Sequence, residues 1–242
     1  MPNVSYCVDR NEVHFKKYTP QPETRIVATF YVSDTSNPTN LIGMSKQGYF
    51  TSLFSEMEVD ATVLGEVVGN YQFSSTGEHV VKYTLVDNTS IGENAFIECI
   101  KMSSVVVPNT VQSIGRGAFS SCTSLASVSL PNSVTLIDEY AFVSCGNLTN
   151  IIIPDSVTEI RRQALSYMGL TSITIPSSVT SLGAQVFAQS NALEHITFLA
   201  ATPPTIDEYT FWNDNGCPIY VPAASVDTYK AAKVWTTYAS RI

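Results

Sequence analysis

The chain has 242 residues and a formal net charge of −8, with 44% apolar and only 14% charged residues. This composition excludes an intrinsically disordered chain, and the absence of an apolar run of about 18 residues excludes a membrane-spanning helix. The 13 basic residues form no cluster and are outnumbered by 21 acidic ones, so we expect no nucleic-acid partner. Residues 1–5 do not begin a basic segment followed by an apolar one, and we expect no signal peptide in this chain.

The first 82 residues contain short apolar alternations separated by polar turns. Residues 25–32 alternate as a half-buried strand does, and residues 71–73 and 79–85 flank a Ser-Ser-Thr-Gly turn that predicts a hairpin. The stretch from Phe73 to Tyr83 is similar to the last strands of bacterial immunoglobulin-like domains. We therefore predict an immunoglobulin-like β-sandwich over residues 1–82. No linker follows it, so we expect a rigid junction with the next module.

A repeat governs residues 83–222. Pro108, Pro131, Pro154 and Pro176 are spaced by 23, 23 and 22 residues, and the segments between them are near copies. The third unit is one residue short, around residues 167–169. Degenerate units on both sides extend the array to about six coils. Each unit has an alternating strand that ends at the proline, because proline cannot donate to a strand ladder. One unit cannot bury its own apolar residues, so the sequence predicts a mainly β solenoid of stacked coils.

The recurring pattern I-x-I-P-x-S-V-T-x-I-G-x-x-A-F-x-x-C-x-x-L resembles the leucine-rich repeats of the BspA-like family over residues 84–222. It stands out in residues 175–180 and 114–119. The resemblance implies binding or adhesion rather than catalysis, at the cell surface or in a secreted protein. Residues 223–242 look like the helix with which the family closes its solenoid. Helical spacing of apolar residues supports this prediction, at Val226, Tyr229, Ala232 and Trp235.

Candidate chemical groups point away from catalysis. Cys99, Cys122 and Cys145 are one repeat apart, so we predict a packed core column, and we assign no role to Cys7 and Cys217. The histidines (residues 14, 79 and 195) lie in no metal or catalytic motif, and no nucleophile elbow or nucleotide loop occurs. Asp207, Glu208 and Asp214 are interpreted as solvated loop acids, with a cation site as the alternative. We therefore predict a non-enzyme with no cofactor and no metal.

The repeat also predicts which side chains face outward from the stacked strands. The first outward column contains Val106, Ser129, Ile152, Thr174, Thr197 and Tyr220. The second contains Ser104, Ser127, Asn150, Ser172 and His195. These neutral, hydroxyl-rich columns favour a protein or glycan partner over a strongly charged one. Two alternatives stay open: such residues simply suit an exposed sheet, or the chain is a structural spacer or assembly module of a surface or phage-like appendage.

Overall fold

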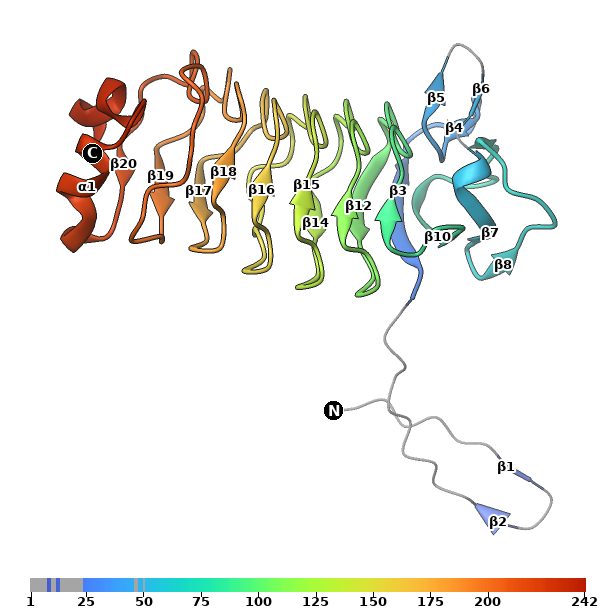
Figure 1. The fold of residues 1–242 in the computed structure, drawn as a ribbon. Helices are drawn as coiled ribbons and strands as arrows, with labels where there is room; N and C mark the ends of the chain where they lie inside the picture. The colour runs from blue at the N-terminus through green and yellow to red at the C-terminus, as the bar shows by residue number, and fades with distance from the viewer. Residues whose placement is uncertain (1–7, 10–11, 14–23, 46–47, 50) are drawn as a thin grey trace.

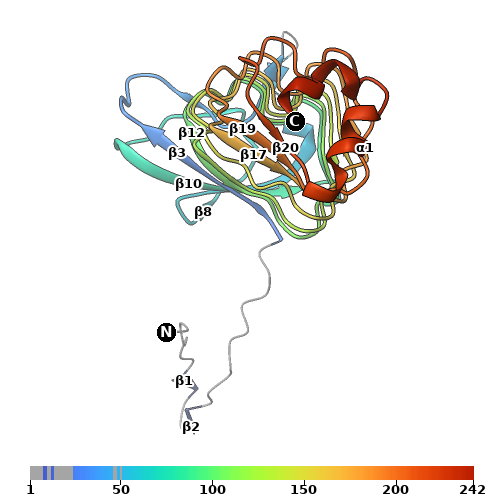
Figure 2. The ribbon, with the colours of Figure 1, turned by 90° about the vertical axis from the view of Figure 1, so that its left-hand side faces the viewer.

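A computed structural model describes residues 8–9, 12–13, 24–45, 48–49 and 51–242. It shows a stack of coils with a sheet-rich module at one end and short helices at the other (Figure 1). Viewed along the stack, successive coils superpose (Figure 2). The solenoid predicted from the repeat is therefore confirmed. Within the described ranges, no helix combines the length and apolarity needed to cross a bilayer.

Two rows of short parallel strands run along the solenoid. In the first row each strand places one buried Ile or Leu beneath its equivalent in the next coil, in the register Ile91–Ile114–Ile137–Ile160–Leu182. This row consists of β11 (Ser90–Ile91), β13 (Ser113–Ile114), β15 (Leu136–Ile137), β16 (Glu159–Ile160) and β18 (Ser181–Leu182). The second row consists of β12 (Met102–Val106), β14 (Ser127–Ser129), β17 (Ser172–Ile175), β19 (His195–Phe198) and β20 (Ile219–Tyr220).

The N-terminal module continues the second row. Its strand β3 (Ile26–Val32) pairs antiparallel with β12 on one side and with β10 (Gly77–Leu85) on the other. Beyond β10 the same sheet adds β7 (Phe54–Val59), which follows the 3-10 turn η1 (Thr51–Leu53), and β8 (Thr62–Val63). The described strands thus extend the solenoid sheet, and the immunoglobulin-like sandwich over residues 1–82 is not confirmed. The rigid junction stays a prediction.

The predicted hairpin between residues 71–73 and 79–85 is wrong. Strand β9 (Asn70–Tyr71) pairs instead with β4 (Thr39–Asn40), because both long neighbours of β10 come from elsewhere in the chain. Two further short pairs complete the described elements: β1 (Val8–Asp9) with β2 (Glu12–Val13), and β5 (Met44–Ser45) with β6 (Gly48–Tyr49).

Stacked phenylalanine rings fill the centre of the coils. Phe96, Phe119 and Phe142 are fully buried, and successive ring centroids are 5.3 Å apart with interplanar angles of 6° and 7°. Leu165 takes the equivalent place in the next coil and ends this run. The stack also joins the two modules, since the Phe96 ring contacts Tyr83 of β10 at 5.1 Å.

The cysteine column packs as the sequence predicts. Cys99, Cys122 and Cys145 are free and fully buried. The Cys122 thiol donates to the Phe96 carbonyl oxygen at 3.1 Å, and the Cys145 thiol donates to the Phe119 carbonyl oxygen at 3.2 Å. Burial raises the pKa of the Cys145 thiol to about 12. The column therefore consists of small protonated core residues.

The turns of the coils place residues in the left-handed backbone region, where L-residues are strained. Ser121 has φ 59° and Tyr140 has φ 60°. This conformation aligns their N–H groups with the stack. The Ser121 N–H donates to the Val143 carbonyl oxygen at 2.8 Å, and the Tyr140 N–H donates to the Arg162 carbonyl oxygen at 3.0 Å. Equivalent bonds to the next coil start at Asn94, Glu98, Gly117, Ser144, Gln163, Tyr167 and Gln185. A third ladder of hydrogen bonds thus accompanies the strained turns.

Short helices cover the C-terminal end of the stack. They are η2 (Ala223–Ser225), α1 (Val226–Ala231) and η3 (Trp235–Arg241). The single helix predicted over residues 223–242 is thus wrong in extent, because the chain is extended at Ala232 and turns at Val234, where φ is 69°. This break lets the Trp235 indole N–H donate to the Pro204 carbonyl oxygen at 2.8 Å. The Tyr229 hydroxyl likewise donates to the Ala200 carbonyl oxygen at 2.9 Å, so hydrogen bonds hold the cap on the solenoid.

Candidate functional site

The second row of strands presents the two predicted columns to solvent. All of their members are exposed or half-buried. Ser129 lies beside Val106, and Thr197 lies between Thr174 and Tyr220 in register. In the other column Ser172 lies beside His195, whose ring is 5.4 Å from that of Tyr220. Sequence analysis predicted partner binding on this surface, and we therefore call it the binding face. It is the outward surface of β12, β14, β17, β19, β20 and residues 150–153.

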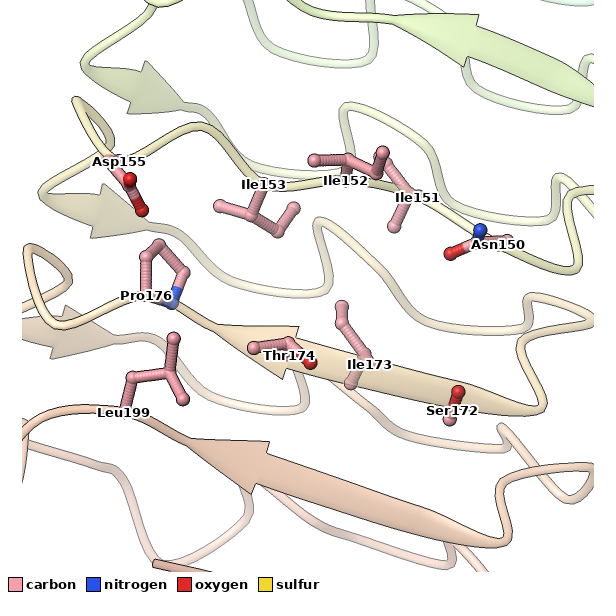
Figure 3. Close-up of a pocket in the computed structure, with 10 residues that line it drawn as sticks. All are labelled: Asn150, Ile151, Ile152, Ile153, Asp155, Ser172, Ile173, Thr174, Pro176 and Leu199. Carbon is pink, nitrogen blue, oxygen red and sulfur yellow. The ribbon is translucent and has the colours of Figure 1, made fainter. Parts of the chain in front are cut away.

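The strand ladder of this face is interrupted at residues 150–153. These residues occupy the strand position of their coil but belong to no strand, and among the described residues Ile151, Ile152 and Ile153 make no backbone hydrogen bond. A pocket of about 280 Å³ opens here. Figure 3 shows its wall being built by three successive coils, with Ile152 on the first, Thr174 on the second and Leu199 on the third.

The interruption accompanies the one short coil. The coil after residues 150–153 lacks one residue, and the chain closes the gap where Gly169 packs against Gly146. A Cβ at Gly169 would lie 2.2 Å from the Gly146 carbonyl oxygen, so only glycine fits this approach. The buried positions nevertheless stay in step, since Leu148 and Leu170 are both fully buried. The short repeat was visible in the sequence, but its consequence for the neighbouring strand row was not predicted.

Apolar side chains at the pocket are unusually exposed. Ile152 is 77% exposed and Leu199 is 52% exposed. Leu199 stands where the preceding coils have Pro154 and Pro176, and its N–H donates to the Ile175 carbonyl oxygen at 3.0 Å, a bond that proline cannot make. Sequence analysis missed Leu199. The signal was present, because a leucine interrupts the column of prolines.

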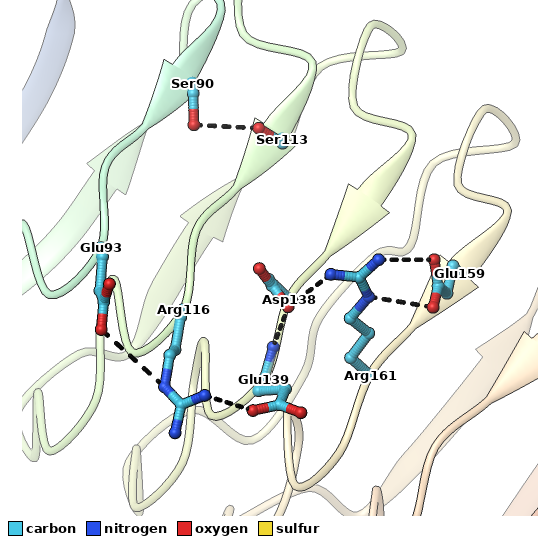
Figure 4. A network of polar contacts seen from close by, with 8 residues as sticks. All are labelled: Ser90, Glu93, Ser113, Arg116, Asp138, Glu139, Glu159 and Arg161. Atoms are coloured by element: carbon cyan, nitrogen blue, oxygen red, sulfur yellow. Dashed lines mark hydrogen bonds and ion pairs between the residues drawn. The ribbon is translucent and has the colours of Figure 1, made fainter.

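Charge on the binding face differs from charge on the turns beside the first row of strands. On the turns beside the first row of strands, Arg116 pairs with Glu139 at 2.6 Å and Arg161 pairs with Asp138 at 3.2 Å, so the basic and acidic charges offset each other (Figure 4). Hydrogen bonds to Glu159 and then Asp138 raise the pKa of Arg161. At the pocket, Asp155 is the only charged lining residue, and no basic partner of it is found in the described part of the chain.

The other candidate groups lie away from this face. His79 is buried, with Nδ1 at 2.7 Å from Asp60 Oδ2 and Nε2 at 2.9 Å from the Ser75 carbonyl oxygen, so it fastens the N-terminal sheet. The prediction that Asp214 is a solvated loop acid is wrong. Its carboxylate pairs with Arg241 at 2.7 Å and the residue is only 2% exposed, because the cap covers the last coil. His14 and Cys7 lie outside the described residues.

The described residues contain no group of three or more His, Cys, Asp or Glu side chains that could hold a metal ion. The pocket contains amide, hydroxyl and carboxylate groups, but it contains no histidine, cysteine or lysine. Such a set can donate and accept hydrogen bonds and bury apolar atoms. The arrangement is therefore suited to recognition.

Comparison with known proteins identifies the repeat. Residues 89–217 match a family described as the BspA type leucine rich repeat region, in six copies. A leucine-rich repeat protein of T. pallidum has a similar structure, with a TM-score of 0.50 and 20% identity, covering 75% of this chain and 78% of that one. This likeness shows the shared fold alone. No match was found among curated proteins.

Two further solved structures are similar over shorter stretches. A leucine-rich repeat protein from Bacteroides ovatus ATCC 8483 is 25% identical, covering 54% of this chain and 40% of that one, with a TM-score of 0.43. A leucine-rich cell surface protein from Faecalibacterium prausnitzii A2-165 is 32% identical, covering 49% and 38%, with a TM-score of 0.39. The chain therefore spans about two fifths of the length of these two proteins.

Proposed function

The chain belongs to the BspA-type leucine-rich repeat family, and we propose that it is a non-catalytic binding or adhesion protein. In this proposal the binding face recognises a protein or glycan partner, and the protein works at the cell surface or after secretion. The family match supports a binding role, since solenoids of this kind expose continuous surfaces that repeat proteins use for binding. Neither the family nor the similar structures indicate an enzyme.

One observation carries the choice of face. Ile152 projects from the only interrupted position of the strand row, beside a pocket, and it is the most exposed of the large apolar side chains in the described residues. An exposed isoleucine on a folded surface loses the free energy that burial would give, about 1.5–3 kcal/mol for a whole side chain. Contact with a partner at this place would recover part of it.

The covered ends of the solenoid favour binding over the alternative role as an assembly module. At the N-terminal end, β3 pairs with β12 and the Tyr83 ring packs on Phe96. At the C-terminal end, Trp235 packs on Phe198 with ring centroids 5.1 Å apart. Both ends of the apolar core are therefore covered within one chain, and end-to-end stacking of copies would first require these caps to move.

The test is a screen of the full chain against an array of glycans and extracellular proteins at near-physiological salt. Replacing Ile152, Thr174 and Thr197 together by Lys charges the binding face and should abolish the saturable hits. A matched variant with Lys at three exposed threonines beside the first row of strands adds the same charge elsewhere and should retain them. These control positions are Thr135, Thr158 and Thr180. Hits that survive in the first variant would refute the assignment of this face.

A further inference from the structure

We propose that the pocket beside Ile152 takes an extended segment of a partner protein, which presents an apolar side chain and, two to three residues away, a lysine or arginine. This inference rests on the proposed binding function and specifies its partner class. It is drawn from the size of the pocket, its one charge, its unpaired backbone groups and the absence of aromatic lining residues.

The pocket is smaller than the cavities that usually enclose a whole small molecule. Its volume of about 280 Å³ lies below the range of about 300–1,000 Å³ in which drug-sized ligands are enclosed. Ile152 and Leu199 stand out from its surface, and Pro176 and Thr174 lie between their coils (Figure 3). An apolar side chain placed there would lie between these two exposed residues.

The charge of the pocket selects a basic neighbour. Asp155 follows Ile152 by three residues and lies at the start of a turn, so the two residues are at most about 10 Å apart along the coil at about 3.3 Å per residue. Two to three residues of an extended ligand span the same length. Among the lining residues only Asp155 is charged, and no lysine or arginine of the described chain pairs with it. A carboxylate in this position attracts a cationic side chain and repels an acidic one.

Backbone and side-chain polarity favour a peptide over a glycan or a lipid. The N–H groups of Ile151, Ile152 and Ile153 make no backbone hydrogen bond within the described structure. Asn150 and Ser172 add amide and hydroxyl groups at the other end of the pocket. A peptide supplies alternating donors and acceptors for these groups, whereas a lipid chain supplies none. No aromatic residue lines the pocket, so a sugar ring has no aromatic face on which to stack.

The test selects a display library of random linear peptides on the immobilised full chain, after depletion on the Ile152→Lys variant. The expected consensus combines an aliphatic or aromatic residue with Lys or Arg two to three positions away. The selected peptide is then synthesised with its basic residue either kept or replaced by Glu. Ile152→Ala should weaken binding of the first peptide by about tenfold. Asp155→Lys should weaken binding of the first peptide more than Ile152→Ala does. The peptide with Glu in place of its basic residue should bind Asp155→Lys more tightly than it binds the unchanged chain.

The proposal is overturned if no consensus emerges, if the consensus is acidic or purely apolar, or if Asp155→Lys binds both peptides equally. Failure of this proposal and failure of the proposed function are distinguishable. If the array partner still depends on the binding face while no peptide is selected, only the partner class is wrong. If the array partner ignores the Lys substitutions on this face, the proposed function itself fails.

Discussion

The phenylalanine stack offers a quantitative test of the packing inside the coils. Replacing Phe119 by Ala removes a fully buried ring that lies 5.3 Å from Phe96 on one side and from Phe142 on the other. Phenylalanine-to-alanine changes in a core cost about 3–5 kcal/mol of unfolding free energy, through lost burial and the remaining cavity. Each ring pair adds about 0.5–1.5 kcal/mol. Phe142 has one stacked ring neighbour, because Leu165 follows it.

Phe119→Ala should therefore cost about 1 kcal/mol more than Phe142→Ala. The free energy of unfolding would be measured by urea titration, followed by circular dichroism and by tryptophan fluorescence, with coincident curves as the check of two-state behaviour. Phe142→Leu is the matched control, since Leu165 already fills the equivalent position, and it should cost less than about 1.5 kcal/mol. A loss below about 1 kcal/mol for Phe119→Ala, or the reverse order of the two alanine variants, would refute this account of the stack.

Three further predictions concern the turns, the cap and the thiols. Gly117→Ala should lower the unfolding free energy by about 1–2 kcal/mol, because φ is 60° at this position and the new Cβ would lie 2.3 Å from Asn94 Oδ1. Gly146→Ala is the control in the same urea titration. It should be near neutral, because a Cβ at Gly146 would meet open space. Arg241→Gln should lower the unfolding free energy by about 3 kcal/mol, since it leaves the Asp214 carboxylate buried without its partner. The double variant Arg241→Gln with Asp214→Asn removes this buried charge, so its thermal melt should show part of the lost stability restored. Burial raises the pKa of Cys145 above that of an unfolded thiol, near 8.5, so this thiol alone should lower the unfolding free energy by up to about 1.4 kcal/mol for each pH unit above pH 8.5, and the other buried thiols of the column, whose pKa values are also raised, should add to this fall. Urea titrations at pH 8 and 10 should therefore show a smaller fall for Cys145→Ala than for the unchanged chain, and an equal fall would contradict the assignment.

The solenoid was predictable because its repeat records local and stacking requirements together. Pro108 and its equivalents mark strand ends, and the alternation around Ile173 and Ile175 marks the half-buried strand. The Phe119 and Phe142 positions follow directly from the period, because identical residues in successive coils must lie above one another. Both rings are buried and stacked as this argument requires.

The N-terminal sheet was not predictable in the same way. The alternation of residues 26–32 predicts strand β3. The same segment does not indicate that the neighbouring strand is β12, whose paired residues lie more than 70 residues further along the chain. Pairing between distant strands depends on tertiary packing rather than on local pattern. The choice between a closed sandwich and an extension of the solenoid sheet therefore lies beyond sequence periodicity.

The candidate site was predicted in part. Ile152 and Thr174 were placed on the outward columns from the repeat alone, and the structure exposes both. The pocket depends on departures from the repeat: one missing residue near Gly169 and a leucine at position 199 in place of proline. How a deletion in one turn affects strand pairing on the neighbouring face is a property of the packed coils, so the sequence shows the departures but not the pocket.

The most direct measurement of the central claim is amide hydrogen exchange of the full chain with and without its partner from the array screen. The amides of Ile151, Ile152 and Ile153 have no backbone acceptor in the described structure and should exchange rapidly in the free protein. The account predicts that partner binding slows exchange in residues 148–176 and leaves residues 134–138, on the first row of strands, unchanged. Protection elsewhere, with unchanged exchange at residues 150–153, would contradict the assignment of the binding face.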